Sequence, residues 1–464
     1  MSGYACEGRP RLRAPFALSR IIITGLALAC AVQLGCAHQR FSSPQVLYHQ
    51  FWAEAASRIY DPASLGNWKE WEHKFDGKLS TSDEAAKAIQ EMLGSIHDRY
   101  TYFMDSLDVM AKAQQSRGQS LDSGIVFYQK VDDDDHPMNA YDGKPLPADS
   151  PDGYPLVEEV SAGSPAESAD IKSGDAIISI NNRDARKQSI HALVRQMRGP
   201  AGSRVLLVLR RGNGQDQQAQ LLLLPHATQD VSSRHLSAGV CYLRLDSFHR
   251  KQIAQLFKQE LEKLADCKGL VFDLRDNPGG YIDQAVAVAS FFLEQGTIVS
   301  MRERIANGGY ERRVYRLTTD RLAESVTVEG SDRTITRWSD RQSNLARGRP
   351  LILLINGETA SSAELLTGAL KDNGRAIAIG TRTFGKGIGQ RERDMPDSTS
   401  LHITTLRFFT PHGAWLGDGG NSESHGIKPD IVVEADDEMQ PGTRNDSQLR
   451  KAVKVLKAKL KRRH

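Results

Sequence analysis

Apolar residues in the first part of the chain recur at helical spacing. Two series mark helical faces between residues 44 and 116: Trp52, Ala56 and Ile59, and then Ala85, Ala88, Ile89, Met92 and Leu93. Ahead of the second series, Thr81-Ser82-Asp83-Glu84 supplies capping side chains and early acidic residues, which are typical of a helix start. The pattern predicts a helical region over residues 41–117.

The pattern changes to short strands between residues 118 and 226. Apolar runs predict one helix near 188–198 and strands at 123–127, 156–160, 176–182 and 204–211. Residues 131–155 are acidic and rich in Pro and Gly, which favours a mobile loop. We expect this segment to fold as a domain of its own.

Residues 227–434 alternate apolar strands with helices. The strands are predicted at 239–248, 269–276, 296–301, 350–356, 376–381 and 402–410. This order predicts an α/β fold with layers around a buried sheet. Residues 305–347 add hairpin-like sequence to which the pattern assigns no role.

The first 37 residues have the pattern of an export leader. Arginines precede an apolar run over residues 21–37, and small residues follow at its end. Leu34-Gly35-Cys36 resembles a lipoprotein cleavage box in which Cys36 is lipidated. Ordinary cleavage after Ala37 and an uncut anchor are the alternatives. We therefore expect export to the periplasm, with membrane attachment through the N-terminus if Cys36 is lipidated.

The other end of the chain is basic. The last 18 residues hold eight Lys or Arg and no acid, and leucine and valine recur among them at helical spacing. Residues 435–464 are expected to form a solvated basic helical tail. Binding to a membrane surface or to a partner is the alternative.

Composition limits the partners and cofactors that the sequence suggests. The 464 residues carry a formal net charge of +3, which favours no nucleic-acid partner. The sequence has no zinc-type Cys/His spacing and no phosphate-binding loop, so we expect neither a metal nor another cofactor. Beyond the leader, Cys241 and Cys267 lie at the same end of two predicted neighbouring strands. They form either a disulfide or two buried free thiols.

A helix is predicted to begin at Ser361-Ser362-Ala363-Glu364, directly after the apolar strand at 350–356. Ser-x-x-Glu is a capping box, and capping alone explains a serine at Ser361. The same position also suits a nucleophile, because a helix start directs free N–H groups toward a developing anion.

Lys386 is the candidate base for such a nucleophile, since none of the 13 histidines falls within 357–390. It lies between Gly385 and Gly387, and these glycines allow close approach of another backbone segment. Its pKa would have to fall by about 3 from ~10.4 for the amine to be half neutral near pH 7, which burial can cause. Gln390 is placed to orient the amine. Without burial, Lys386 is an ordinary paired or solvated lysine.

The segment 118–226 resembles a PDZ domain in Gly163-Ser164-Pro165-Ala166, Gly174-Asp175 and Ile177-Ile178. PDZ domains bind a peptide as an added strand, and backbone N–H groups hold its C-terminal carboxylate. The resemblance places this carboxylate loop at Leu121, Asp122, Ser123, Gly124 and Ile125. Asp122 lies where the anion should bind, which is expected to weaken carboxylate capture or to shift the preference to internal segments.

Four motifs occur together around the candidate serine and lysine: Thr359-Ala360-Ser361 with Glu364, Asp372-Asn373-Gly374-Arg375, Phe384-Gly385-Lys386-Gly387 with Gln390, and Asp273-Leu274-Arg275 with Gly279-Gly280. Together they resemble the carboxyl-terminal processing proteases, also called tail-specific proteases, over about residues 45 to 434. The resemblance implies a ClpP/crotonase-like core of sheet and helices with an inserted PDZ domain.

The same resemblance assigns roles to single residues. It makes Ser361 the nucleophile, Lys386 the general base and Gln390 the residue that orients the lysine. Gly280 and the backbone N–H of Ser362 form the oxyanion hole, and the side chain of Ser362 is not expected to contribute. Asp372 is expected to be structural, pairing with Arg375 or capping a helix end.

The implied function is a serine endopeptidase that cleaves extended or unfolded proteins near their C-termini. Its PDZ domain would recognise the substrate tail and regulate activity. The expected partners are protein or peptide substrates with apolar C-termini, and an adaptor protein or a homo-oligomer is left open. A non-catalytic scaffold and a crotonase-like acyl-CoA enzyme are the competing hypotheses.

Overall fold

The computed structural model describes residues 43–120, 122–127, 153–186, 188, 190–212, 214–237, 239–342, 344–346, 348–435 and 441–462. The expected leader with Cys36, Leu121, and most of the acidic loop at 131–155 lie outside the described residues. Among the helices that are described, none has both the length and the apolar character needed to span a bilayer.

The N-terminal region folds into helices, as predicted. They are α1 (Pro44–Arg58), a 3₁₀ turn (Pro62–Leu65), α2 (Trp68–Glu72), α3 (Ser82–Gly94) and α4 (Ser106–Gln115). The capping box of Thr81 and Glu84 starts α3, as the sequence indicates. Strand β1 (Tyr102–Met104) pairs antiparallel with β20 (Thr399–Phe409), although the two strands are far apart in the sequence. The helical region is therefore joined to the sheet of the core.

The segment 118–226 forms a domain with its own apolar core. Its elements are β3 (Ile125–Phe127), β4 (Val157–Val160), α5 (Pro165–Ser168), β5 (Asp175–Ile180), β6 (Arg183–Asp184), α6 (Ile190–Gln196), β7 (Arg204–Arg211) and β8 (Asp216–Leu222). The strands run in the order β6-β5-β7-β8, and β3 pairs with β4. Strands β2 (Gln119–Ser120) and β9 (His226–Ala227) pair antiparallel at its two ends, so the domain is an insertion.

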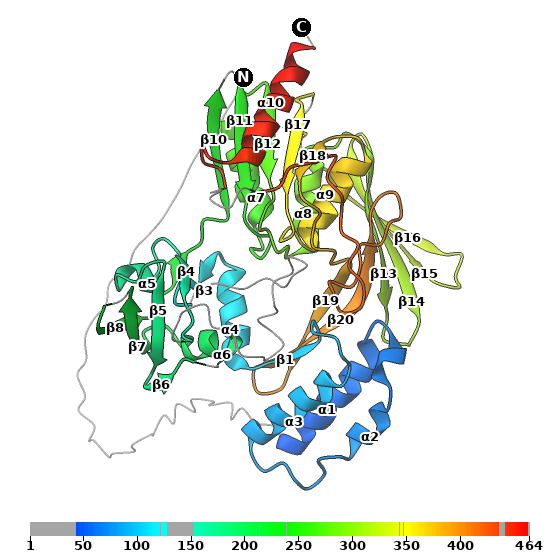
Figure 1. Cartoon of the computed structure of the whole chain (residues 1–464). Coiled ribbons are helices and arrows are strands. Elements are labelled where there is room, and N and C mark those ends of the chain that lie inside the picture. Colours follow the sequence, from blue (N-terminus) through cyan, green and yellow to red (C-terminus); the bar gives the residue numbers. More distant parts are fainter. Residues whose placement is uncertain are drawn as a thin grey trace, which may run out of the picture. The chain divides into compact units, whose positions relative to one another are not determined.

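A six-stranded sheet forms the centre of the core. Its order is β10 (Val231–Ser237), β11 (Val240–Leu245), β12 (Gly269–Asp273), β17 (Leu351–Ile355), β18 (Ile377–Gly380) and β21 (Ile431–Val432). Only β10 is antiparallel to its neighbour. Successive residues of β12 are buried on opposite faces, Phe272 against α7 (Ile253–Lys263), α8 (Ile282–Ser290) and α9 (Ser362–Asp372), and Val271 against α10 (Ser447–Lys461) (Figure 1).

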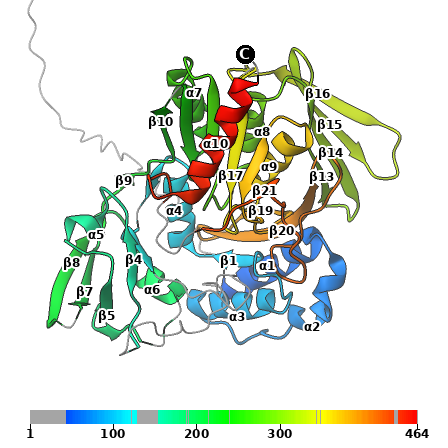
Figure 2. The same ribbon diagram turned by 45° about the horizontal axis from the view of Figure 1, so that its top comes forward.

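The residues 305–347 extend a second, antiparallel sheet. It runs β1-β20-β13-β14-β15-β16, with β19 (Ile388–Met395) also paired to β20. The added strands are β14 (Tyr310–Leu317), β15 (Arg321–Val328) and β16 (Thr334–Asp340), which follow β13 (Gly296–Arg304). Figure 2 shows β14, β15 and β16 side by side, extending the sheet outward from β13.

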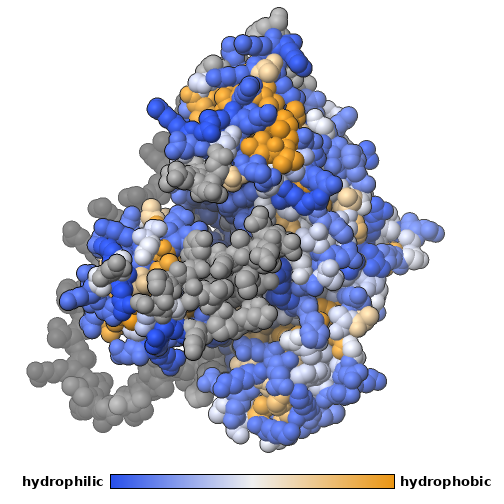
Figure 3. All heavy atoms as spheres, viewed as in Figure 1, coloured by the Kyte–Doolittle hydropathy of each residue, from blue (hydrophilic) through white to orange (hydrophobic). Residues whose placement is uncertain are grey.

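The expectation of a solvated terminal helix is wrong. In α10, Leu449, Ala452 and Leu456 are buried against the apolar outer face of the six-stranded sheet. The spacing of these residues gives α10 one apolar face, and the sheet supplies the surface that it covers. Figure 3 shows apolar side chains gathered beside α10 on a face that is otherwise largely polar.

Cys241 and Cys267 form a disulfide, with 5.9 Å between their Cα atoms. Their strands β11 and β12 are parallel neighbours, as predicted. The alternative of two free thiols is therefore wrong.

Candidate active site

Ser361 occupies a sharp turn between β17 and α9. Its φ of 53° and ψ of −117° are unusual for a residue that is not glycine, and only the surrounding structure can hold them. Such a turn between a strand and a helix exposes a serine side chain at the end of a sheet. Ser361 is partly exposed, so the turn presents it at the surface of the core.

The fully buried carboxylate of Glu364 joins this turn to the loop of the lysine. Its Oε2 accepts the N–H of Ser361 at 2.9 Å and the N–H of Lys386 at 2.8 Å. Its Oε1 accepts the N–H of Gly385 at 2.7 Å and the hydroxyl of Thr383 at 2.6 Å. Burial raises the pKa of Glu364, and these donors oppose the rise. One oxygen atom thus fixes the backbones of both candidate catalytic residues.

Lys386 is partly buried, and its Nζ lies 3.9 Å from the centre of the Tyr100 ring. Burial lowers the pKa of Lys386 from 10.5 to about 8, because the ammonium loses hydration. Asp98 opposes this change and Arg99 adds to it. The expected desolvation of Lys386 is thus present.

The glycines beside Lys386 permit close packing of backbones. Gly385 has a φ of +92°, and a β-carbon there would approach Leu416 O at 3.0 Å. At Gly387 a β-carbon would lie 2.9 Å from Leu416 N. These approaches confirm that the glycines beside the lysine allow another backbone segment to lie close to the loop.

The loop at Gly279 and Gly280 lies against the serine turn. A β-carbon on Gly279 would lie 2.8 Å from Ala360 O, and as close to Ser361 Cβ and Ser362 N. The Ser362 hydroxyl donates to Gly280 O at 2.7 Å, a contact that the sequence pattern does not predict. The hydrogen bonds described for these residues do not use the N–H of Gly280 or of Ser362.

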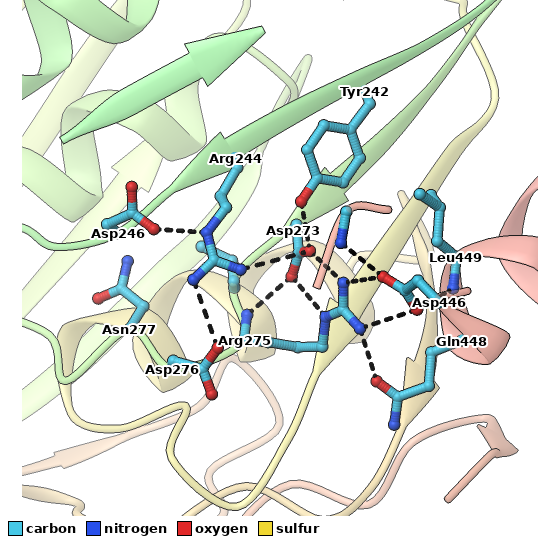
Figure 4. A network of polar contacts seen from close by, with 12 residues as sticks. Tyr242, Arg244, Asp246, Asp273, Arg275, Asp276, Asn277, Asp446, Gln448 and Leu449 are labelled. Atoms are coloured by element: carbon cyan, nitrogen blue, oxygen red, sulfur yellow. Dashed lines mark hydrogen bonds and ion pairs between the residues drawn. The ribbon is translucent and has the colours of Figure 1, made fainter. Parts of the chain in front are cut away.

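A buried ion-pair network holds the start of that loop (Figure 4). Arg275 is fully buried and donates to Asp273 Oδ1 at 2.9 Å, Asp446 Oδ2 at 2.6 Å and Gln448 Oε1 at 2.9 Å. The Tyr242 hydroxyl donates to Asp273 Oδ2 at 2.7 Å. Because both carboxylates are bound to the same guanidinium, the network ties the loop after β12 to the start of α10.

Two histidines lie near Lys386. Burial, together with smaller effects of the charges of Lys112 and Lys386, lowers the pKa of His249 to about 4 and that of His402 to about 3. Both imidazoles are therefore neutral at physiological pH. The sequence patterns did not identify them, since they are far from the serine and lysine motifs.

Two predicted contacts are not formed in this arrangement. Gln390 Nε2 donates to Thr404 Oγ1 at 3.1 Å, and among the described residues no hydrogen bond joins Gln390 to Lys386. The Asp372 carboxylate accepts the His412 N–H at 3.0 Å, which agrees with a structural role, while Arg375 donates to carbonyl oxygens such as that of Phe292.

In the predicted carboxylate loop, the described residues bind to one another. Asp122 Oδ1 accepts the N–H of Gly124 at 2.8 Å, and Ser123 Oγ accepts the N–H of Ile125 at 3.2 Å. The loop leads into β3, as the resemblance requires.

Comparisons with known proteins agree with the division of the chain into the core and the inserted domain. Residues 239–433 match the family model "Peptidase family S41", and residues 156–211 match the model "PDZ domain". The chain is 33% identical over 276 residues to the carboxy-terminal-processing protease of Bartonella bacilliformis, covering 58% of this chain and 56% of that relative. It is 28% identical over 401 residues to the carboxyl-terminal-processing protease of Picosynechococcus sp., covering 85% and 84%.

Among solved structures, the photosystem II D1 C-terminal processing protease superposes with a TM-score of 0.54 and 22% identity. The superposition covers 85% of this chain and 94% of that one. At this identity the likeness shows the fold. The expected α/β core with a PDZ domain is confirmed.

Proposed function

The chain is a serine peptidase of family S41 with a PDZ domain, like the carboxyl-terminal processing proteases, and on this premise we propose that Ser361 and Lys386 form its catalytic dyad. In this proposal the enzyme is an endopeptidase that cleaves extended or unfolded proteins near their C-termini. The observation that carries the dyad is the shared Glu364 oxygen, which holds the backbones of both residues.

Each group in the site has a step to perform. Neutral Lys386 takes the proton of Ser361 as the serine oxygen attacks the scissile carbonyl. The N–H groups of Gly280 and Ser362 stabilise the oxyanion, and the Ser362 hydroxyl holds the carbonyl of Gly280 in place. The lysine then returns the proton to the leaving amine. Water activated by the same lysine releases the acyl group.

The proposal also includes recognition of the substrate by the PDZ domain and regulation of the core. Helix α4 contacts both the PDZ domain and the core. Arg198 Nη1 pairs with Asp108 Oδ1 at 2.8 Å, which links the PDZ domain to α4. On the same helix, Lys112 Nζ pairs at 2.5 Å with Oε2 of Glu392, which lies in β19 together with Gln390. A shift of the PDZ domain would therefore act on the surroundings of the lysine.

We extend the proposal to location and assembly. Export to the periplasm is supported by the Cys241–Cys267 disulfide, since such bonds persist in oxidising compartments. Attachment through lipidated Cys36, delivery of substrates by an adaptor and a homo-oligomeric state remain proposals from the sequence.

The test uses a soluble form that begins at Phe41, incubated with an unfolded protein that ends in apolar residues. Cut positions are read by mass spectrometry. We expect cleavage to be lost in Ser361→Ala and in Lys386→Ala and kept in Lys428→Ala, because Lys428 is an exposed lysine outside the site. Cleavage that survives both substitutions would overturn the dyad. An unfolded substrate left intact by all four proteins would favour the scaffold hypothesis.

A further inference from the structure

The loop that should receive a ligand carboxylate already contains one. Asp122 precedes β3, and its Oδ1 accepts the N–H of Gly124 at 2.8 Å. The next N–H of the loop, at Ile125, is bound to Ser123 Oγ at 3.2 Å. Captured carboxylates in PDZ domains use such N–H groups at the start of the groove strand. Both groups are thus bound by side chains of the loop itself.

The Asp122 carboxylate is also held from the strands at the two ends of the domain. The Ser120 hydroxyl donates to Oδ2 at 2.5 Å, and His226 Nε2 lies 3.8 Å from Oδ1. Ser120 and His226 face each other across the β2–β9 pair. The Asp122 side chain is nevertheless 48% exposed. A ligand carboxylate at the loop would therefore meet a negative charge that is held in place.

The edge of β3 is suited to bind an added strand. Within the described residues β3 pairs only with β4, and Val126 is 41% exposed. An extended segment that pairs with this edge gains main-chain hydrogen bonds whether or not it ends there. A terminal carboxylate must in addition replace Asp122 as the acceptor of the Gly124 N–H. It would then lie close to the Asp122 carboxylate, and the two negative charges would repel each other.

We propose that the PDZ domain of this chain binds an internal extended segment of its substrate and that Asp122 excludes a terminal carboxylate. The inference rests on the proposed role of the domain as substrate receptor. It names the substrate class more narrowly: unfolded proteins bound through an internal apolar stretch, so that the free C-terminal carboxylate is not the recognised group.

The experiment compares two peptides of about twelve residues with the same apolar sequence, one ending in a free acid and one in an amide. Both carry a fluorophore at the N-terminus, and binding to the full Ser361→Ala protein is followed by fluorescence anisotropy. We expect the amide to bind at least as tightly as the acid. Added Asp122→Ala should strengthen binding of the acid about tenfold, or ~1.4 kcal/mol, and leave the amide within about twofold.

Two further variants separate the causes. Asp122→Asn removes the charge and retains an oxygen for the Gly124 N–H, so it should give part of the gain. Asp216→Ala removes an equal charge from the PDZ surface, where Asp216 pairs with Arg210, and should leave the ratio of the two affinities unchanged.

The inference is overturned if the parent protein prefers the acid, if Asp122→Ala leaves the ratio unchanged, or if no protein binds either peptide. Because nothing is cleaved in this assay, its failure is distinct from a failure of the catalytic proposal. That proposal stands or falls with the Ser361→Ala and Lys386→Ala cleavage test.

Discussion

The rate of cleavage is expected to follow the deprotonation of Lys386. A general base must be neutral to accept the proton of the serine, and burial lowers the pKa of this lysine to about 8. At pH 7 about one molecule in eleven then carries a neutral amine, and at pH 9 about ten in eleven do. The value of kcat/KM should therefore rise about tenfold between pH 7 and pH 9 and then level off.

Two neighbours of Lys386 allow a test of the direction in which the pKa of the lysine shifts. Asp98 raises the pKa of the lysine and Arg99 lowers it. Asp98→Asn should shift the pH profile to lower pH, because it removes an anion that favours the ammonium. Arg99→Gln should shift the profile to higher pH. The two histidines near the lysine do not titrate in the pH range of the profile, since the pKa values of His249 and His402 lie at about 4 and about 3.

The assay is the initial rate of cleavage of a fluorogenic peptide far below KM, between about pH 6 and pH 9.5 at constant ionic strength. Circular dichroism at each pH checks that the fold is retained. A flat profile, a midpoint near the ordinary lysine value of 10.5, or a shift of both variants in the same direction would refute the assignment of Lys386 as the base.

Three further outcomes follow from the same structure. Glu364→Gln should lower kcat about 100-fold with little change in KM, because misplacement of reacting groups by about 1 Å has such an effect; an unchanged kcat in a folded variant would contradict this. Reduction of the Cys241–Cys267 disulfide, which closes a separation of 26 residues, should lower the free energy of unfolding by about 3.5 kcal/mol, measured by urea titration with and without dithiothreitol, and no shift of the midpoint would oppose it. Lys386→Met should raise the free energy of unfolding by about 3 kcal/mol at pH 7, since the lowered pKa penalises the charged lysine below about pH 8, and this gain should fade as pH rises toward 10.5. An equal gain at pH 7 and pH 9.5, or the same gain in the exposed Lys428→Met, would exclude this explanation.

The sequence predicts those features that depend on local spacing or on neighbouring strands. The capping box at Thr81, the glycines beside Lys386 and the proximity of Cys241 to Cys267 are of this kind, and the structure shows all of them. In each case a few adjacent residues, or two consecutive parallel strands, determine the geometry.

Features that depend on distant partners are not predictable in this way. The capping-box pattern identifies one partner of Glu364, but the other partners come from the separate loop of Lys386. Tyr100 lies next to β1, which pairs with the distant β20, and its ring contacts the lysine. The periodicity of α10 reveals an apolar face without indicating what covers it, and so the helix was expected to be solvated.

The pairing of β1 with β20 has a consequence for the time at which this peptidase can first act. Asp98, Arg99 and Tyr100 precede β1, whereas β20 does not exist until residue 409 has been synthesised. The ion pair of the buried Arg275 with Asp446 can form only later, after residue 446 has been synthesised. In a nascent chain, Ser361 is therefore present before β1 and β20 can pair around Lys386. If Lys386 is the base, as we propose, the site is complete only after the last-made part of the chain has joined the part that was made first.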